Sequence, residues 1–131
     1  MAKSINEILL HWRIKADNDF TVAEKELKSK SPVTDAVCFH CQQAAEKYLK
    51  LFLVYNGIEP KKTHLISDLI IECSKIDTDF EKLSQSAYLS DYAVELRYPD
   101  DFYIPDLEET KEAFESAKMI KNFVLNRINI H

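Results

Sequence analysis

The stretch DAVCFHCQQAAEKYLKLFLVYNG, Asp35 to Gly57, carries the strongest indication of the fold in this sequence. At helical spacing its apolar side chains cover nearly every direction around the axis, which is typical of a helix at the centre of a bundle. Ser31 and Pro32 before it match a helix start, with proline at the first helical position. Gly57 matches a helix end, because glycine readily adopts the left-handed conformation of a C-terminal cap. The sequence therefore predicts a central helix from about residue 31 to residue 56.

Four more segments with helical spacing of apolar residues flank this central one. Ser4 with Glu7, and Thr78 with Glu81, form capping boxes that mark two of the helix starts. No segment alternates strictly enough to predict a strand, and short connections favour antiparallel neighbours. We therefore expect an all-α fold, an up-and-down antiparallel bundle of about five helices, in one domain over residues 1–131. The outer helices are expected at about residues 4–28, 63–75, 78–97 and from 106 onward.

The composition excludes several classes of protein. Apolar residues make up 46% and charged residues 30%, which is typical of a globular chain. The net charge of -5, without a broad basic face, argues against bulk binding along a nucleic-acid backbone and favours a local polar site. Three cysteines without framework spacing fit a reducing cytosol. There is no signal-peptide core and no apolar run of about 18 residues, so we expect a cytoplasmic protein without a membrane segment.

A polar stripe interrupts the apolar surface of the central helix. At about 100° per residue, His40, Gln43 and Lys47 fall within one narrow sector. One interpretation is that this sector is simply the solvent side of the helix. The other is a groove for a ligand or partner, because imidazole, amide and ammonium groups suit phosphate and nucleobase groups.

Two carboxylates lie on faces that are otherwise apolar. Asp19 falls in the apolar stripe of the first helix, and Asp91 in that of the fourth. Each needs a partner, because an unpaired buried charge is costly, and Lys47 and Arg97 are candidates. These carboxylates could form ion pairs that join two helices, or they could belong to a functional network, and the sequence leaves both interpretations open.

The segment CFHC invites comparison with a zinc site. Zinc sites usually need a second pair of ligands, and only the isolated Cys73 and His64 are available. Within a helix, Cys38 and His40 also point far apart. Packing of the thiols in the apolar core explains them better, so we expect no metal and no other cofactor.

Several of these residues together resemble the HEPN family, the "higher eukaryotes and prokaryotes nucleotide-binding" domains. The matching pieces are Trp12, Ala16, Asp19 and Ala23, then FHCQQAAEKYLK, then Gly57, His64 and Leu65, and RYPD from Arg97 to Asp100. The resemblance spans nearly the whole chain. It implies a compact bundle of roughly five helices that commonly forms homodimers. Family members are often encoded with a minimal nucleotidyltransferase, in toxin–antitoxin or related two-component systems.

Many HEPN proteins are metal-independent ribonucleases, with an arginine followed after four to six residues by a histidine. Arg97 matches the arginine, but residues 102–104 contain no histidine. Proton transfer near neutral pH usually relies on imidazole, and Tyr103, with an ordinary pKa of about 10, could replace it only with strong tuning. The resemblance therefore implies the short, non-nucleolytic type of HEPN domain, and we predict no catalytic residue.

The leading hypothesis is a nucleotide-binding or adaptor module that pairs with a minimal nucleotidyltransferase. The predicted nucleotide-binding residues are His40, Gln43, Lys47, Arg97 and Asp100. Two alternatives stay open. One is a divergent ribonuclease that uses His40 or Tyr103 in place of the missing histidine. The other is a purely structural module that binds another protein through the aromatic residues after Arg97.

Overall fold

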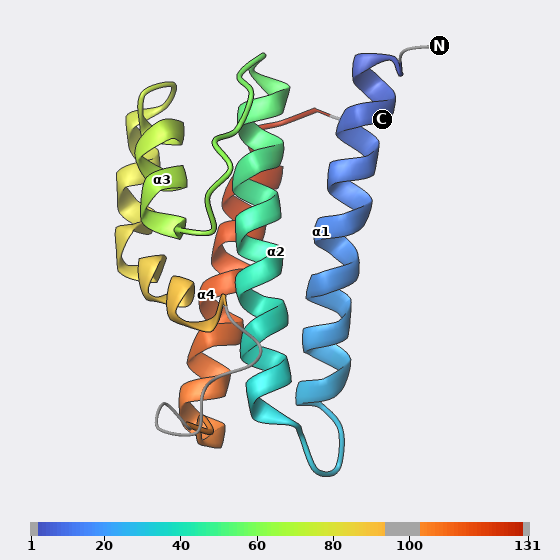
Figure 1. Cartoon of the computed structure of the whole chain (residues 1–131), viewed down its shortest axis with the longest axis vertical. Helices are drawn as coiled ribbons and strands as arrows, with labels where there is room; N and C mark the ends of the chain where they lie inside the picture. The colour runs from blue at the N-terminus through green and yellow to red at the C-terminus, as the bar shows by residue number, and fades with distance from the viewer. Residues whose placement is uncertain (1–2, 94–102, 130–131) are drawn as a thin grey trace.

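The computed structural model describes residues 3–93 and 103–129, and within them it contains helices and no strand (Figure 1). The helices are α1 (Ile5–Leu27), α2 (Thr34–Tyr55), α3 (Ile66–Ser74), the 3₁₀-helix η1 (Thr78–Tyr92) and α4 (Leu107–Leu125). The predicted all-α bundle is therefore confirmed. Among the described residues, no helix combines the length and the apolar character needed to cross a bilayer.

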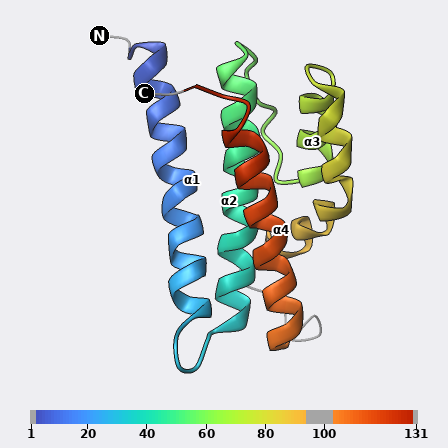
Figure 2. The same cartoon turned by 180° about the vertical axis from the view of Figure 1, so that it is seen from behind.

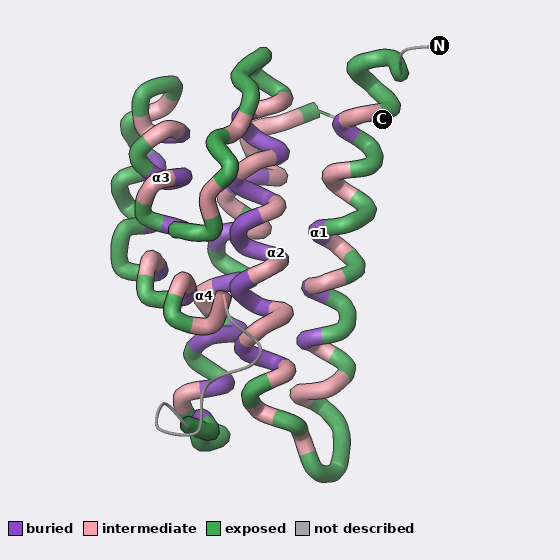
Figure 3. The backbone as a smooth tube through the Cα atoms, viewed as in Figure 1, coloured by how far each residue is buried: buried purple, intermediate pink, exposed green. Residues whose placement is uncertain are grey.

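Helix α2 lies at the centre of the bundle and contacts each of the other four elements. Figures 1 and 2 show α1 on one side of α2 and the α3–η1 pair on the other. Helix α4 packs against α2, behind it in Figure 1 and in front of it in Figure 2. Buried residues recur along the whole of α2, as Figure 3 shows, and include Tyr48, Leu49 and Phe52. The apolar pattern of residues 35–57 therefore identified the central helix correctly.

The predicted helix starts near Ser4 and residue 106 are confirmed, and the predicted start of α2 is wrong. Ser4 accepts a hydrogen bond from the backbone of Glu7 at 3.2 Å and caps α1 as predicted, and Asp106 caps α4. Helix α2 begins at Thr34 rather than at Ser31–Pro32, and its N-cap residue makes no side-chain hydrogen bond. The carboxylate of Glu26 accepts a hydrogen bond from the backbone N–H of Val33 at 3.0 Å. Val33 has extended backbone angles, with φ of -82° and ψ of 93°, so the helical conformation begins only at Thr34.

The fourth segment is a 3₁₀-helix, and its start differs from the predicted capping box. Asp77, not Thr78, accepts the capping hydrogen bond, from the backbone of Asp79 at 2.9 Å. Arg127 from the end of the chain lies 3.0 Å from the Asp77 carboxylate, which fixes that side chain in the capping position. The predicted continuation of this helix to Arg97 falls on residues 94–102, outside the described part of the chain.

Aromatic contacts join η1 to the helices around it. The ring of Phe80 lies 4.3 Å from that of Phe52 on α2 and 4.8 Å from that of Phe123 on α4, measured between centroids. The guanidinium of Arg127 lies 3.6 Å from the centre of the Phe123 ring. These contacts hold η1 against α2 and α4.

Candidate functional site

The polar stripe of α2 faces α1, where Asp19 pairs with two of its members. The Asp19 side chain is only 14% exposed, and its Oδ1 lies 2.9 Å from His40 Nδ1. Its other oxygen forms an ion pair with the ammonium of Lys47. Lys47 is therefore the partner of Asp19, as the sequence suggested. The stripe is half-buried between two helices and is not a freely solvated face.

A second polar contact along the same interface was missed at the sequence level. The Tyr48 hydroxyl donates to the carboxylate of Asp17, which also lies 3.0 Å from the guanidinium of Arg13. Burial and the hydrogen bond to Asp17 raise the pKa of Tyr48. In the sequence, Tyr48 is one more apolar position on α2, so its pattern carries no signal for this contact. The contact between Tyr48 and Asp17 joins α2 to α1 two residues before Asp19 in the sequence.

The third predicted residue of the stripe, Gln43, belongs to a different network. Its amide donates to Gln42 Oε1 at 2.6 Å, and Gln42 in turn donates to the buried carboxylate of Glu46 at 3.0 Å. Glu46 also lies 2.9 Å from both Lys50 and His64. Burial acts to raise the pKa of Glu46, but hydrogen bonds from Lys50, His64 and Gln42 outweigh it and hold that pKa below its usual value. Gln43 is therefore part of a structural network that fastens the loop before α3.

A pocket of about 440 Å³ opens between the N-terminal turns of α1 and the middle of α2. Helical spacing brings its α1 residues onto one face, and Lys47 closes it from α2. It is lined by Lys3, Ile8, His11, Trp12, Lys15 and Lys47. The lining thus combines an indole, an imidazole and three ammonium groups, with no carboxylate among those residues. We call it the Trp12 pocket. Of the predicted site residues that the structure describes, Lys47 lines it, whereas His40 and Gln43 do not.

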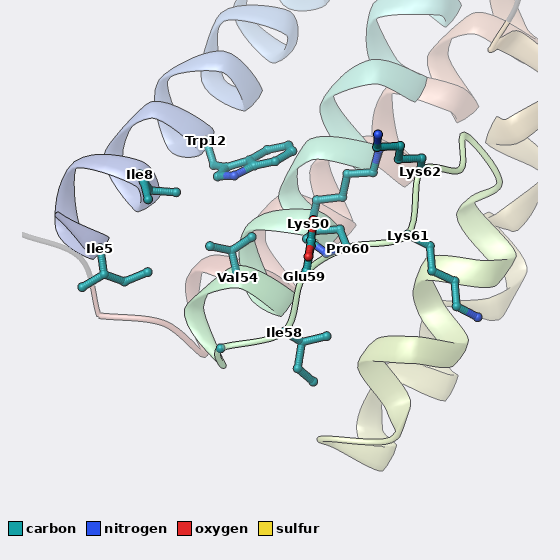
Figure 4. A pocket seen from close by; sticks show the side chains of 11 residues that line it. Ile5, Ile8, Trp12, Lys50, Val54, Ile58, Glu59, Pro60, Lys61 and Lys62 are labelled. Carbon is teal, nitrogen blue, oxygen red and sulfur yellow. The ribbon is translucent and has the colours of Figure 1, made fainter. Parts of the chain in front are cut away.

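A second pocket, of about 590 Å³, also includes the Trp12 indole in its lining (Figure 4). It shares Ile8 and Trp12 with the first pocket, includes Ile5 from the start of α1, and is otherwise built by the end of α2 and the chain after it. Gly57 has a φ of 77°, which turns the chain out of α2 to form the second wall. The remaining residues that line this second pocket are Ile5, Lys50, Val54, Ile58, Glu59, Pro60, Lys61 and Lys62. We call it the Ile58 groove. Lys61 and Lys62 are adjacent in the sequence, and the fold brings Lys50 of α2 into the same lining.

The remaining predicted groups are not placed in either pocket. Arg97 and Asp100 lie outside the described residues. Tyr103 donates its hydroxyl to Glu109, and that hydrogen bond raises the pKa of Tyr103, which opposes its use as a base near neutral pH. This contact argues against Tyr103 as a substitute for the ribonuclease histidine.

The cysteines pack as apolar groups. All three are buried, and burial raises the pKa of Cys38 to about 11 and that of Cys73 to about 12. Thiols with such pKa values stay protonated and are poor nucleophiles and metal ligands. Within the described ranges, no group of three histidine, cysteine or acidic side chains is arranged to hold a metal ion.

The order of the helices and the polar contacts between α1 and α2 define a small helical-bundle domain. A model of the HEPN domain matches residues 9–128, so the chain belongs to the HEPN family. Among solved structures, the chain is 28% identical to ST0689, described as an archaeal HEPN homologue, with a TM-score of 0.71. It is also 28% identical to TT1696 from Thermus thermophilus, with a TM-score of 0.77. Each match covers 92% of this chain and 98% of the other. No curated protein matched significantly.

Proposed function

We propose that this HEPN domain is a non-nucleolytic module that binds an anionic nucleotide in the Trp12 pocket. The observation that carries the proposal is the pocket lining, which holds an indole and three lysines in a chain of net charge -5. A nucleobase can stack on an indole, and ammonium groups bind phosphate through charge-assisted hydrogen bonds. No other described pocket combines these groups without a carboxylate in its lining.

The cations of the pocket have different roles in this proposal. Lys15 makes no ion pair with any described residue, so its ammonium is free to bind phosphate. Lys47 is only 25% exposed and is held by Asp19 at the wall of the pocket. His40 contacts the other carboxylate oxygen of Asp19 and acts as a positioning residue for Lys47. Of the other predicted residues, Gln43 has no direct part here, and a contact from Arg97 or Asp100 stays a prediction.

Calorimetric titration with AMP, ADP and ATP tests the proposal. We expect Lys15→Ala and Lys47→Ala each to weaken binding about tenfold, corresponding to about 1.4 kcal/mol. The matched control is Lys118→Ala, which removes an exposed lysine of α4 outside the described pockets and should leave affinity unchanged. Circular dichroism of each variant establishes that the helices are retained. Wild-type protein that gives no heat with any of the three nucleotides would falsify the proposal.

We further propose, on the basis of family membership, that the domain pairs with a minimal nucleotidyltransferase in a toxin–antitoxin-like system and forms a homodimer. Co-expression with a nucleotidyltransferase encoded next to this chain, followed by affinity purification and sedimentation, provides the test. We expect the two proteins to sediment as one complex and this chain alone to sediment as a dimer. Separate elution of the two chains would count against pairing, and a monomeric mass would count against the homodimer.

A further inference from the structure

The Ile58 groove leaves an apolar surface open next to lysines. Ile5 is 56% exposed and Ile58 is 37% exposed, although both line a concave surface together with Trp12. Figure 4 shows the Trp12 indole reaching from α1 toward α2, with Val54 and Ile58 below it. An exposed apolar surface with a polar rim is a common mark of a protein interaction site. We propose that the Ile58 groove docks an acidic amphipathic segment of a partner protein.

The wall of the groove is held in place before any partner arrives. The backbone N–H of Ile58 donates to Leu53 at 2.9 Å, which fastens the first part of the wall to α2. Lys61 at the other end lies 3.0 Å from Glu72 on α3. Beyond it, His64 contacts the buried Glu46 at 2.9 Å. A surface that is already ordered loses little conformational entropy on binding, so the groove is preorganised for a partner.

The charges on the rim select an acidic partner. Lys50, Lys61 and Lys62 face a single lining carboxylate, that of Glu59. Lys50 and Lys61 are already paired with Glu46 and Glu72, whereas Lys62 makes no ion pair with the described residues. A partner segment with apolar anchors and flanking acidic residues would cover the floor and neutralise Lys62. Complementary charge of this kind favours one partner over others.

The charges also disfavour a second copy of this chain as the occupant. A second copy bound groove to groove about a twofold axis would bring the lysines of both grooves together, which costs free energy. The docking proposal does not depend on nucleotide binding, because the Trp12 pocket uses Lys15 and Lys47 instead.

Selection of a random peptide library displayed on phage against the whole chain tests the proposal. Trp12 is the only tryptophan, so its emission reports binding of tryptophan-free peptides synthesised from the selected clones. We expect enriched peptides to combine large apolar residues with aspartate or glutamate and to change the Trp12 emission. Ile58→Glu and Lys62→Glu should each weaken their binding at least tenfold. The matched controls Ile71→Glu and Lys118→Glu, at exposed positions outside the groove, should leave it unchanged.

One set of variants distinguishes nucleotide binding in the Trp12 pocket from peptide docking in the Ile58 groove. Lys15→Ala should weaken ATP binding and leave peptide binding intact, whereas Lys62→Glu should do the reverse. Lys62→Glu also keeps the test informative should Ile58→Glu fail to fold. Enriched peptides that bind the groove variants as tightly as wild type, peptides without acidic residues, or no enrichment would each overturn the docking proposal. If the chain associates with itself and Lys62→Glu or Ile58→Glu abolishes that association, the docking proposal is also overturned, because the groove then binds a second copy of the chain.

Discussion

Asp19 lies on a helix face that is otherwise apolar, and a lone carboxylate buried there would be costly. It is retained because α2 presents both His40 and Lys47 to it. The carboxylate places the Lys47 ammonium at the edge of the Trp12 pocket, so one residue contributes to stability and to the shape of the site. Either role predicts a measurable loss when the charge is removed.

We expect Asp19→Asn to lower the free energy of unfolding by about 1–3 kcal/mol, because it leaves the partly buried ammonium of Lys47 without its counter-charge. Urea denaturation measures the change. Glu115→Gln, at an exposed position on α4, is the matched control and should change stability by less than about 0.5 kcal/mol. Adding Lys47→Met to Asp19→Asn should recover part of the loss, and equal stability of Asp19→Asn and wild type would contradict the expectation.

Glu46 predicts a dependence of stability on acid pH. Its pKa is lowered in the folded protein, so the unfolded chain binds a proton more readily than the folded one. The stabilisation is therefore fully present above the unfolded pKa of about 4.3, and it is lost as the pH falls toward the lower folded value. We expect unfolding midpoints measured from about pH 6 down to pH 3 to fall more steeply for wild type than for Glu46→Gln. Parallel curves would show that Glu46 contributes nothing to this dependence.

The 3₁₀-helix η1 has the buried residues Phe80, Leu83, Ser86 and Leu89, spaced every third position. That spacing matches three residues per turn, and an α-helix of the same sequence would rotate this face away from the core. The sequence therefore displays the periodicity of η1. An α-helix is still the usual prediction for such a segment, because 3₁₀-helices of this length are uncommon.

We expect the backbone amides of η1 to exchange with solvent faster than those of the buried middle of α2. Hydrogen bonds in a 3₁₀-helix have poorer geometry, and η1 lies at the edge of the bundle whereas α2 lies at its centre. Hydrogen exchange followed by NMR provides the measurement. Equal protection of residues 78–92 and residues 37–53 would mean that η1 opens only when the whole domain unfolds.

In the molecule as a whole, basic and acidic side chains gather in different regions, whereas packing is centred on one helix. The net charge is -5, yet lysines gather around Trp12 at the end of the α1–α2 pair away from the turn that joins them. Glu108, Glu112 and Glu115 lie instead on α4, around a pocket shared with η1. Packing, by contrast, is centred on a single helix, because α2 contacts every other element.

A core organised around one helix predicts a single cooperative unfolding transition. Trp12 reports on the α1–α2 frame, whereas circular dichroism reports on all the helices. We expect both signals to give the same urea midpoint, as two-state unfolding requires. A Trp12 transition at lower urea would show that the N-terminal part of α1 separates before the rest of the domain.

The sequence alone predicted the all-α class, the central position of α2, the cap at Ser4 and a helix start near residue 106. These features depend on local spacing and on hydrogen bonds within a few residues, which a sequence displays directly. It also indicated the pairing of Asp19 with Lys47, because an acid on an apolar face requires a partner. The predicted start of α2 was too early, because Val33 is extended and the helix begins only at Thr34.

The division of the polar stripe between two networks depends on how the helices pack. His40 and Lys47 converge on Asp19, whereas Gln43 joins the Glu46 network, although all three share one sector of α2. The Trp12 pocket and the Ile58 groove likewise need residues from α1, α2 and the chain after Gly57. Periodicity places a side chain on a face of its own helix, but which neighbour covers that face depends on packing between segments far apart in the chain.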